Sequence, residues 1–308
     1  GALNSLRVLD LTRVWAGPLG TRALADFGAD VIKISDPRTL LDSSARVNNK
    51  LNRNKRNIGI RLDKEKGREI FLRLVTISDI VVENYRPRVM RNLNLSYHDL
   101  RDANPTVIMC SMPGFGLDGP YSEYPAFGST AEAISGVVSL IGYDPDRPLQ
   151  TGLSYADPIS GLNAVWTIMG YARRRAKAGM GCYLDLALSE SPLGTLGEHF
   201  VSSSAGNQHV KIDGNRHPVY CPHGAFRTLG DDIWVTIAVT SNEEWSSLKA
   251  VLSDKILENP CYEHAEGRKS SEDILNRTIS QWAGEREADE IVALLQHAKV
   301  PSGKVLNN

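Results

Sequence analysis

The sequence predicts an α/β protein, with a large Rossmann-like domain built on a mostly parallel sheet and a smaller α+β domain after it. Short apolar runs that are typical of buried strands alternate with helix-like segments along most of the chain. The alternation stops at a stretch rich in Gly, His, Asn and Pro and then begins again. With 308 residues, 42% of them hydrophobic, the chain is long enough for two such domains.

The first elements are a strand, a loop, a helix and a second strand. Residues 6–11 (LRVLDL) predict the first strand and residues 13–18 the loop. A helix follows over residues 19–27 and ends at Gly28, and residues 29–34 (ADVIKI) predict the next strand. The loops of such a unit follow the carboxyl ends of parallel strands, where folds of this kind bind their ligands.

The same alternation predicts the rest of the large domain. Asn104-Pro105 ends one helix, and a basic turn followed by Gly179 ends the longest one, as is typical of helix C-termini. The predicted strands are residues 57–60, 80–83, 107–111 and 183–188, and the predicted helices are residues 67–76, a helix ending at 100–103, 129–140, 158–177 and one beginning at Glu190.

We expect three parts in the chain. Residues 1–204 form the large domain, residues 205–224 a linker or functional loop, and residues 225–308 the small α+β domain. In the small domain the predicted strands lie near Phe226 and at residues 234–239, and the predicted helices cover residues 243–252, 271–282 and 288–298.

The composition argues against several kinds of protein. The formal net charge is −1, so no overall charge favours nucleic acid or an anionic membrane. The four cysteines stand far apart, which disfavours zinc and disulfide frameworks and fits a reducing compartment, so we expect a cytoplasmic protein. No apolar run approaches the ~20 residues of a membrane span. No charged-then-apolar leader precedes the first strand, so no secretory signal is predicted.

The first loop does not match a dinucleotide-binding motif. It reads Gly17-Pro18-Leu19-Gly20, whereas the fingerprint is G-x-G-x-x-G, and Pro18 lacks the backbone N–H that would face a pyrophosphate. Asp36 follows the second strand, where a ribose would bind, but acidic residues are common at strand ends. No Walker A sequence is present. A nicotinamide, flavin or nucleoside triphosphate ligand is therefore disfavoured.

A basic run, Asn52-Arg53-Asn54-Lys55-Arg56, stands directly before a predicted strand. It is either a solvated surface loop or a phosphate-binding segment, since Lys and Arg hold phosphates by charge-assisted hydrogen bonds. Arg38 follows the second strand, and Arg86 and Arg91 follow the strand that ends at Glu83. We expect all of these cations at one edge of the parallel sheet, where they would bind an anion with several phosphates.

Asp157 stands before Pro158 and the long predicted helix. Asp is a preferred N-cap and Pro a preferred first helical residue, so helix capping alone explains this pair. A catalytic role is compatible with this position, because the positive end of the helix dipole stabilises the carboxylate as an anion. An ionised carboxylate is a nucleophile, and nearby backbone N–H groups can receive a developing oxyanion.

The histidines predict neither a metal site nor a hydrolase triad. Residues 215–218 (NRHP) and His223 lie close in sequence, but no carboxylate or Cys stands at metal-ligand spacing. No G-x-S-x-G elbow offers a nucleophilic serine. We therefore expect no metal and no permanently bound cofactor.

Short motifs run in order along nearly the whole chain. They are residues 8–13 (VLDLTR), 16–18 (AGP), 28–34 (GADVIKI), 52–56 (NRNKR), 82–87 (VENYRP), 104–105 (NP), 114–116 (GFG), 119–120 (GP), 135–136 (SG), Asp157 with Gly161, and 214–218 (GNRHP). Each motif is weak by itself, but the ordered set resembles the family III CoA-transferases, or CaiB/BaiF family. This family includes formyl-CoA transferase, carnitine CoA-transferase and α-methylacyl-CoA racemase.

The resemblance implies transfer of CoA from an acyl-CoA to a carboxylic acid. In the family, the Asp at the position of Asp157 attacks the acyl-CoA to form a mixed anhydride, and the CoA thiolate converts it to an aspartyl-CoA thioester. The acceptor acid reverses these steps, and water must be excluded because both intermediates hydrolyse. The residues that would hold CoA are Val14, Trp15, Ala16, Arg38, Asn54, Lys55, Arg56, Asn84, Tyr85, Arg86 and Arg91.

The same resemblance implies an acyl-CoA and a small carboxylic acid as partners and an interlocked homodimer, with no nucleic acid and no membrane. Formyl-CoA transferase carries a Tyr-Glu pair where this chain has Phe127-Gly128, and a glycine-rich loop after the large domain. Neither is present here, which disfavours oxalate and formate as substrates. The segment between Ile34 and Asn52 is also shorter than is usual in the family.

Two alternatives to transfer stay open. In racemases of the family a His within a Gly-His-Asp string moves the proton, whereas Phe127 stands at that place here, so a 2-methylacyl-CoA racemase or epimerase is disfavoured. The other alternative is a CoA-binding protein without catalysis. It is suggested because family members usually continue well beyond the place of Gly303 and return to the first domain, and without that return segment the interlocked dimer is in question.

Overall fold

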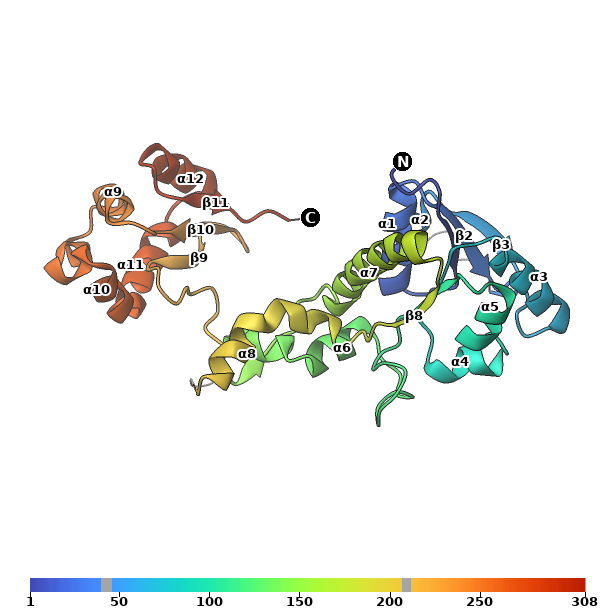
Figure 1. Ribbon diagram of the computed structural model, residues 1–308. Helices are drawn as coiled ribbons and strands as arrows, with labels where there is room; N and C mark the ends of the chain where they lie inside the picture. The colour runs from blue at the N-terminus through green and yellow to red at the C-terminus, as the bar shows by residue number, and fades with distance from the viewer. Residues whose placement is uncertain (40–45, 207–211, 308) are drawn as a thin grey trace. The chain divides into compact units, whose positions relative to one another are not determined.

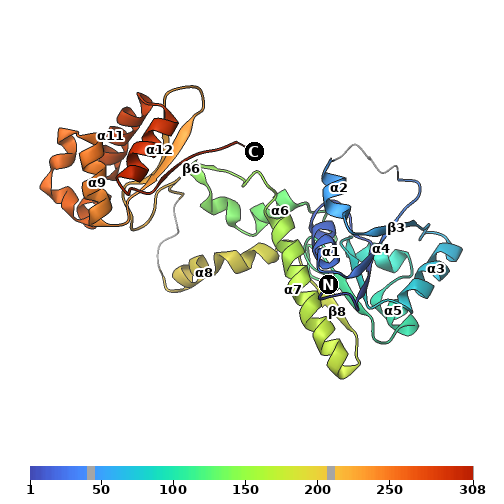
Figure 2. The same cartoon turned by 90° about the horizontal axis from the view of Figure 1, so that it is seen from above.

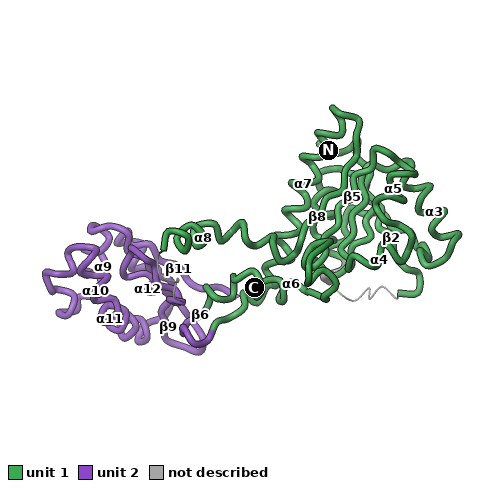
Figure 3. Tube along the Cα trace, turned by 60° about the horizontal axis from the view of Figure 1, so that its bottom comes forward, with its two compact units in different colours: residues 1–141, 148–210 green, residues 142–147, 211–308 purple. Residues whose placement is uncertain are grey.

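The computed structural model describes residues 1–39, 46–206 and 212–307 and divides into two compact units (Figure 3). Unit 1 contains residues 1–141 and 148–210, and unit 2 contains residues 142–147 and 211–308. The small unit therefore includes two segments that the sequence did not assign to it, a short hairpin near residue 144 and most of the predicted linker.

Unit 1 is built on a six-stranded sheet whose strands are all parallel (Figure 1). The strand order is β3-β2-β1-β4-β5-β8. The strands are β1 (Arg7–Asp10), β2 (Asp30–Ser35), β3 (Arg56–Gly59), β4 (Ile80–Glu83), β5 (Ile108–Ser111) and β8 (Cys182–Asp185). The predicted α/β class with a parallel sheet is confirmed.

Helices cover both faces of this sheet, because successive residues of each strand point to opposite sides. Val8 packs with α1 (Ala16–Asp26) and α7 (Ala156–Ala178) on one face, whereas Leu9 packs with α3 (Glu65–Val75), α4 (Pro87–Asn92) and α5 (Tyr97–Ala103) on the other. Figures 1 and 2 both show α1 lying alongside α7. The central strands β1, β4 and β5 are therefore buried on both faces, as their apolar sequences predict, whereas the edge strand β3 is exposed.

Two predicted helices of unit 1 begin or end elsewhere in the structure. The helix predicted at residues 129–140 is α6 (Gly128–Ile134) and a separate 3₁₀ turn, η1 (Val137–Leu140), since Gly136 has a φ of 89° and interrupts the helix. The long helix α7 begins before Asp157, not after it. The remaining helical segments of unit 1 are α2 (Arg46–Asn52), η2 (Ser191–Leu196) and α8 (Gly197–Ser204).

Unit 2 is a three-stranded antiparallel sheet with helices packed around a core that contains the fully buried Trp245. The strand order is β11-β10-β9. Its elements are β6 (Gly142–Asp144), β9 (His223–Arg227), β10 (Trp234–Ala238), α9 (Asn242–Leu252), η3 (Lys255–Glu258), η4 (Pro260–Glu263), α10 (Ala265–Ser270), α11 (Glu272–Gly284), α12 (Ala288–His297) and β11 (Ser302–Lys304), and β6 pairs with β7 (Arg147–Pro148).

The strand order reverses between β1 and β4. The chain leaves β1 toward β2 on one side and leaves β4 toward β5 on the other, so the loops after these neighbouring strands diverge and leave a crevice at their carboxyl ends. Open α/β sheets bind their ligands in such a crevice. The structure thereby indicates that a ligand-binding site would lie at the loops after Asp10 and after Glu83.

No described helix is long and apolar enough to cross a bilayer.

Candidate active site

Asp157 lies in the first turn of α7, one residue after the first helical residue Ala156. The N-cap is Tyr155, so the interpretation of Asp157 as the N-cap with Pro158 first in the helix is wrong. The chain enters the helix through Ser154, whose φ is 46°, so that Asp157 lies within the first turn. Capping therefore does not explain Asp157.

The Asp157 carboxylate receives backbone N–H groups from two other helices. Its Oδ1 accepts a hydrogen bond of 3.2 Å from the N–H of Ala16, the first residue of α1. The N–H of Gly128, the first residue of α6, is a second donor. The amino ends of α1, α6 and α7 thus meet at one carboxylate, and their dipoles favour negative charge there.

Asp157 is almost buried, with 7% of its surface exposed. Burial raises the pKa of its carboxyl above the ordinary value of 3.8, and the hydrogen bonds from Ala16 and Gly128 partly oppose this rise. No Lys, Arg or His of the described ranges forms an ion pair with it. The result is a poorly hydrated carboxylate held by dipoles and not by a counter-ion, which suits a nucleophile and an oxyanion site.

Glycines permit this close meeting of helices. A Cβ on Gly128 would lie 1.8 Å from Oδ2 of Asp157, so no larger residue fits there. Where α1 crosses α7, a Cβ on Gly161 would lie 2.6 Å from the carbonyl oxygen of Ala16, and one on Gly20 would lie 2.7 Å from that of Gly161. The small residues bring the α1 backbone within reach of Asp157.

The two loops of the crevice are tied together by side chains. The Asn84 amide accepts the N–H of Arg13 at 2.7 Å and donates to the carbonyl of Arg13 at 2.8 Å. The hydroxyl of Tyr85 donates to the carbonyl of Leu11 at 2.6 Å. Asn84 and Tyr85 therefore shape the loop that leads into α1 and to Ala16. Val14 (φ 65°) and Trp15, the N-cap of α1, lie on the same loop.

A cavity of about 300 Å³ lies beside this crevice in unit 1. Arg38 lines it but pairs with Asp36 at 2.5 Å, and Arg91 pairs with Glu123 at 3.1 Å. The lining residues are Arg13, Ile34, Ser35, Asp36, Arg38, Ile60, Leu62, Asp63, Tyr85, Val89 and Leu93.

Two exposed arginines in this region lack an acidic partner. Neither Arg13 nor Arg86 pairs with an acidic side chain of residues 1–39, 46–206 or 212–307. Arg13 lines the cavity, and Arg86 follows β4 as the N-cap of α4. Arg13 and Arg86 are therefore the cations best able to take a phosphate.

The basic run does not lie with these arginines, so the prediction of one shared edge is wrong for it. Arg53 and Asn54 bind Asp26 at the end of α1, and Arg56, the first residue of β3, pairs with Asp30, the first residue of β2. These contacts belong to the amino-terminal edge of the sheet. The physical reason is that the run precedes its strand, whereas Arg38 and Arg86 follow theirs.

Lys55 points from that edge into the protein. Its side chain is 1% exposed, and its ammonium contacts Oδ2 of Asp10 at 2.9 Å, the carbonyl of Pro18 at 3.0 Å and the hydroxyl of Thr21 at 2.8 Å. Burial lowers the pKa of Lys55, and Asp10 opposes this shift. Lys55 therefore supports the start of α1 from inside.

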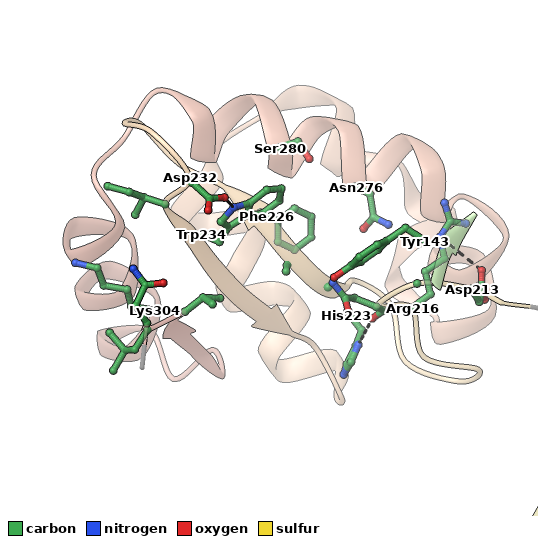
Figure 4. Close-up of a pocket in the computed structure, with 18 residues that line it drawn as sticks. Tyr143, Asp213, Arg216, His223, Phe226, Asp232, Trp234, Asn276, Ser280 and Lys304 are labelled. Carbon is green, nitrogen blue, oxygen red and sulfur yellow. Dashed lines mark hydrogen bonds and ion pairs between the residues drawn. The ribbon is translucent and has the colours of Figure 1, made fainter. Parts of the chain in front are cut away.

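Unit 2 contains a separate cavity of about 930 Å³, shown in Figure 4. Phe226, Trp234 and Tyr143 line it, together with Arg216 of the sequence GNRHP. Its cations have partners, since Arg216 pairs with Asp213, Glu272 and Asp273, and Lys304 pairs with Asp289. The described residues contain no group of three side chains suited to a metal ion. This cavity therefore offers neither an unpaired cation nor a metal-ligand set among its described residues, and it is a weaker candidate for the active site than the region around Asp157.

Sequence reasoning missed three contributors to the site in unit 1. Gly128 and Arg13 stood in or beside the quoted motifs but were given no role, and Glu132, a buried residue of α6, received no mention. A glycine at the start of a predicted helix, directly after Phe127 at the position of the racemase His, could have indicated a role for Gly128. No sequence pattern pairs Glu132 with its partners, because these lie 19 or more residues away.

Comparisons with known proteins agree with the resemblance seen in the sequence. The family model for CoA-transferase family III matches residues 3–308. The chain is 32% identical to succinyl-CoA:mesaconate CoA-transferase of Haloarcula hispanica, over all of this chain and 81% of that protein. It is 28% identical to human succinyl-CoA:glutarate CoA-transferase, over 99% of this chain and 72% of the relative.

The fold is also similar to that of a solved structure. A CaiB/BaiF family protein from Brucella suis superposes with a TM-score of 0.91 at 29% sequence identity. The superposition covers 99% of this chain and 84% of the Brucella protein. Both units of the present structure are therefore included in the likeness.

Proposed function

The chain belongs to CoA-transferase family III, and on this premise we propose that Asp157 carries the acyl group and then CoA during the reaction. The protein is an enzyme that transfers CoA, with an acyl-CoA and a carboxylic acid as its substrates. CoA is thus a substrate, and the interpretation as a non-catalytic CoA-binding protein is set aside.

The first half of the proposed reaction moves CoA from the donor to the enzyme. A carboxylate oxygen of Asp157 attacks the thioester carbon, the carbon–sulfur bond breaks, and CoA leaves as a thiolate. The product is a mixed anhydride between the donor acyl group and Asp157. The thiolate then attacks Cγ of Asp157, which forms an aspartyl-CoA thioester and releases the donor acid as its carboxylate.

The second half runs in the opposite direction with the acceptor. The acceptor carboxylate attacks Cγ of the thioester and displaces the CoA thiolate, which gives a new mixed anhydride. The thiolate attacks the acceptor acyl carbon, so the new acyl-CoA leaves and the Asp157 carboxylate is restored. No external energy source is needed, because every step exchanges a thioester for an anhydride or an anhydride for a thioester. An activated acyl group is therefore present throughout the reaction.

The observation that carries this proposal is the pair of N–H groups at Asp157. Ala16 and Gly128 donate to the carboxylate before the reaction, and the same donors are positioned for the oxyanion that develops when Cγ is attacked. Burial of Asp157 limits access of water to both intermediates. A capping residue would need neither feature.

We place CoA at the crevice between β1 and β4. Arg13 and Arg86 would bind its phosphates, Val14, Trp15 and Ala16 would line the path toward Asp157, and the 300 Å³ cavity would take part of the nucleotide. The other residues of the proposed CoA site are Arg38, Asn84, Tyr85 and Arg91. Asn54 and Arg56 are left out because their contacts lie at the amino-terminal edge of the sheet, and Lys55 because its side chain is buried against Asp10.

The first donor to test is succinyl-CoA, which is named for the human and Haloarcula relatives, with glutarate and mesaconate as acceptors. Racemisation gains no support from the site. Phe127 immediately precedes Gly128 as the N-cap of α6 and cannot transfer a proton. Solvent deuterium exchange at the α-carbon of a 2-methylacyl-CoA, without an acceptor, would reverse this conclusion.

We further propose a homodimer that acts in a reducing compartment such as the cytoplasm. Trp166 on α7 is 72% exposed, and Leu162 on the same helix and Val201 on α8 are exposed as well. Exposed large apolar side chains of this kind are expected at an interface with a second copy. The four cysteines are free. Light scattering of the purified protein tests the assembly.

Trapping of the intermediates tests the function. Incubation with succinyl-CoA followed by hydroxylamine or borohydride modifies Asp157, as found by peptide mass spectrometry. The variant Asp157→Ala binds CoA but transfers none, and Asp157→Asn controls for lost volume. Turnover by Asp157→Ala at a rate near that of the unaltered enzyme would refute the role.

A further inference from the structure

A second carboxylate in this region is buried without a cation. Glu132 on α6 is 0% exposed, and no Lys, Arg or His within the described ranges pairs with it. Burying an ionisable carboxyl group is costly unless hydrogen bonds replace its hydration. An apolar residue would fill a helix position in the core at less cost, so the contacts of Glu132 need an explanation.

Its hydrogen bonds all go to the segment that leads into α7. Oε1 accepts the backbone N–H of Thr151 at 2.6 Å, and Oε2 accepts the hydroxyl of Thr151 at 3.0 Å. Oε2 also accepts the backbone N–H of Tyr155 at 2.9 Å. One side chain thus holds both ends of residues 151–155.

This segment connects directly to the nucleophile. Tyr155 is the N-cap of α7 and stands two residues before Asp157, whose own N–H donates to the carbonyl of Ser154 at 2.9 Å. Ser154 has a φ of 46°, so the chain is sharply bent where it enters the helix. A bent segment needs external contacts to keep one conformation.

The other end of the connection is α6 itself. Glu132 lies one turn after Gly128, the residue whose N–H donates to Asp157. Glu132 therefore links α6, whose Gly128 supplies an N–H to Asp157, to the segment 151–155 that leads to Asp157. Its three hydrogen bonds join α6 to the segment that leads to Asp157.

We infer that Glu132 is a positioning residue for CoA transfer, which holds the 151–155 segment against α6 so that Asp157 meets the N–H of Gly128. The inference rests on the proposed role of Asp157 as the nucleophile. It assigns no contact between Glu132 and substrate. A displacement of the attacking oxygen by about 1 Å is enough to slow a reaction on the order of a hundredfold.

The test compares the rate of aspartyl-CoA formation with the affinity for CoA. In Glu132→Gln the side chain keeps its size, but its amide nitrogen cannot accept an N–H, so at least one of the three hydrogen bonds is lost. We expect the single-turnover rate of aspartyl-CoA formation from succinyl-CoA to fall at least about tenfold, while the dissociation constant of CoA changes less than about twofold. The exposed Glu69→Gln on α3 is the matched control and keeps both values.

A second pair of variants covers the case in which Glu132→Gln does not fold. Thr151→Val removes the hydroxyl, which donates to Glu132 and accepts the N–H of Leu153, and should slow aspartyl-CoA formation a few-fold, and Thr151→Ser should restore it. Aspartyl-CoA formation at the unaltered rate in Glu132→Gln, or in Thr151→Val when that is the variant that folds, would overturn the inference. If the unaltered enzyme turns over without any adduct on Asp157, the proposed function itself fails, which is a different result.

Discussion

Oδ1 of Asp157 accepts a hydrogen bond from the backbone N–H of Ala16, a residue 141 positions earlier in the chain. The contact joins the amino ends of α1 and α7 and is possible because Gly20 and Gly161 let the two helices approach closely. The proposed nucleophile is thus positioned by the packing of helices on the sheet, and the loops after β1 and β4 place the proposed CoA site beside it.

A methyl group at position 128 should abolish activity. In Gly128→Ala the new Cβ would lie 1.8 Å from Oδ2 of Asp157, so the carboxylate or the start of α6 must move. We expect kcat to fall at least about a hundredfold with an unchanged circular dichroism spectrum. Gly170→Ala on α7 is the control, since no atom lies within 4 Å of its Cβ, and it should keep full activity. Normal turnover by Gly128→Ala would show that the observed approach of α6 to Asp157 is not needed.

The unpaired arginines should contribute to CoA affinity. We expect Arg13→Ala and Arg86→Ala each to weaken CoA binding by about tenfold, since each removes a charge-assisted contact to phosphate, and the loss should shrink at high salt. Isothermal titration calorimetry with CoA gives the dissociation constants. Arg173→Ala, an exposed arginine of α7, serves as the control. Unchanged affinity in both variants would place CoA elsewhere.

Lys55 should matter for stability and not for CoA. Lys55→Met leaves the fully buried Asp10 with Lys33, at 3.3 Å, as its remaining cation, so we expect a loss of about 3 kcal/mol of unfolding free energy, the lower end of the cost of breaking a buried ion pair. Arg56→Met breaks an exposed pair with Asp30 and should cost less than about 1 kcal/mol. Urea denaturation measures both values. Equal stability of the two variants would contradict the structural role given to Lys55.

Glu83 should make stability depend on pH. Burial raises its pKa from 4.5 to about 7, although hydrogen bonds from Ser111 and Tyr85 oppose the rise. The folded protein therefore binds this proton more tightly than the unfolded chain, so ionisation of Glu83 costs stability on the order of 3 kcal/mol. The cost is absent below about pH 4.5, grows through neutral pH and is complete above the folded pKa.

The variant Glu83→Gln isolates this effect. Its unfolding free energy, measured by urea denaturation between pH 5 and pH 8, should fall less with rising pH than that of the unaltered protein. Parallel pH dependences for the two proteins would mean that Glu83 does not keep its proton on folding.

The central strands β4 and β5 were predictable because they are buried on both faces and therefore read as continuous apolar runs, such as residues 80–83 (IVVE). Strand β11 was missed because Ser302-Gly303-Lys304 carries no such pattern and pairs only through its backbone with β10. The short helix α4 was not predicted, because residues 82–87 (VENYRP) were interpreted only as a family motif, whereas Pro87 begins the helix.

Sequence motifs gave the proposed reactive residue, Asp157, and the loop at Ala16, but not the contacts that hold them. Their mutual contact depends on the crossing of α1 and α7. The direction of each strand determines at which edge of the sheet a neighbouring cation lies. Arg86 follows β4 and lies at the carboxyl edge, whereas Arg56 begins β3 and lies at the amino edge. The link from Glu132 to Thr151 spans 19 residues without any periodic signal and becomes visible only in the fold.

The most direct test of Asp157 as carrier follows an oxygen atom. When the acceptor acid bears heavy oxygen in its carboxylate, the second anhydride is cleaved at the acceptor carbon, so one labelled oxygen stays on Asp157. Peptide mass spectrometry after a single turnover with succinyl-CoA should find one heavy oxygen in the peptide that contains Asp157 and in no other. Formation of the new acyl-CoA with that peptide unlabelled would contradict the account.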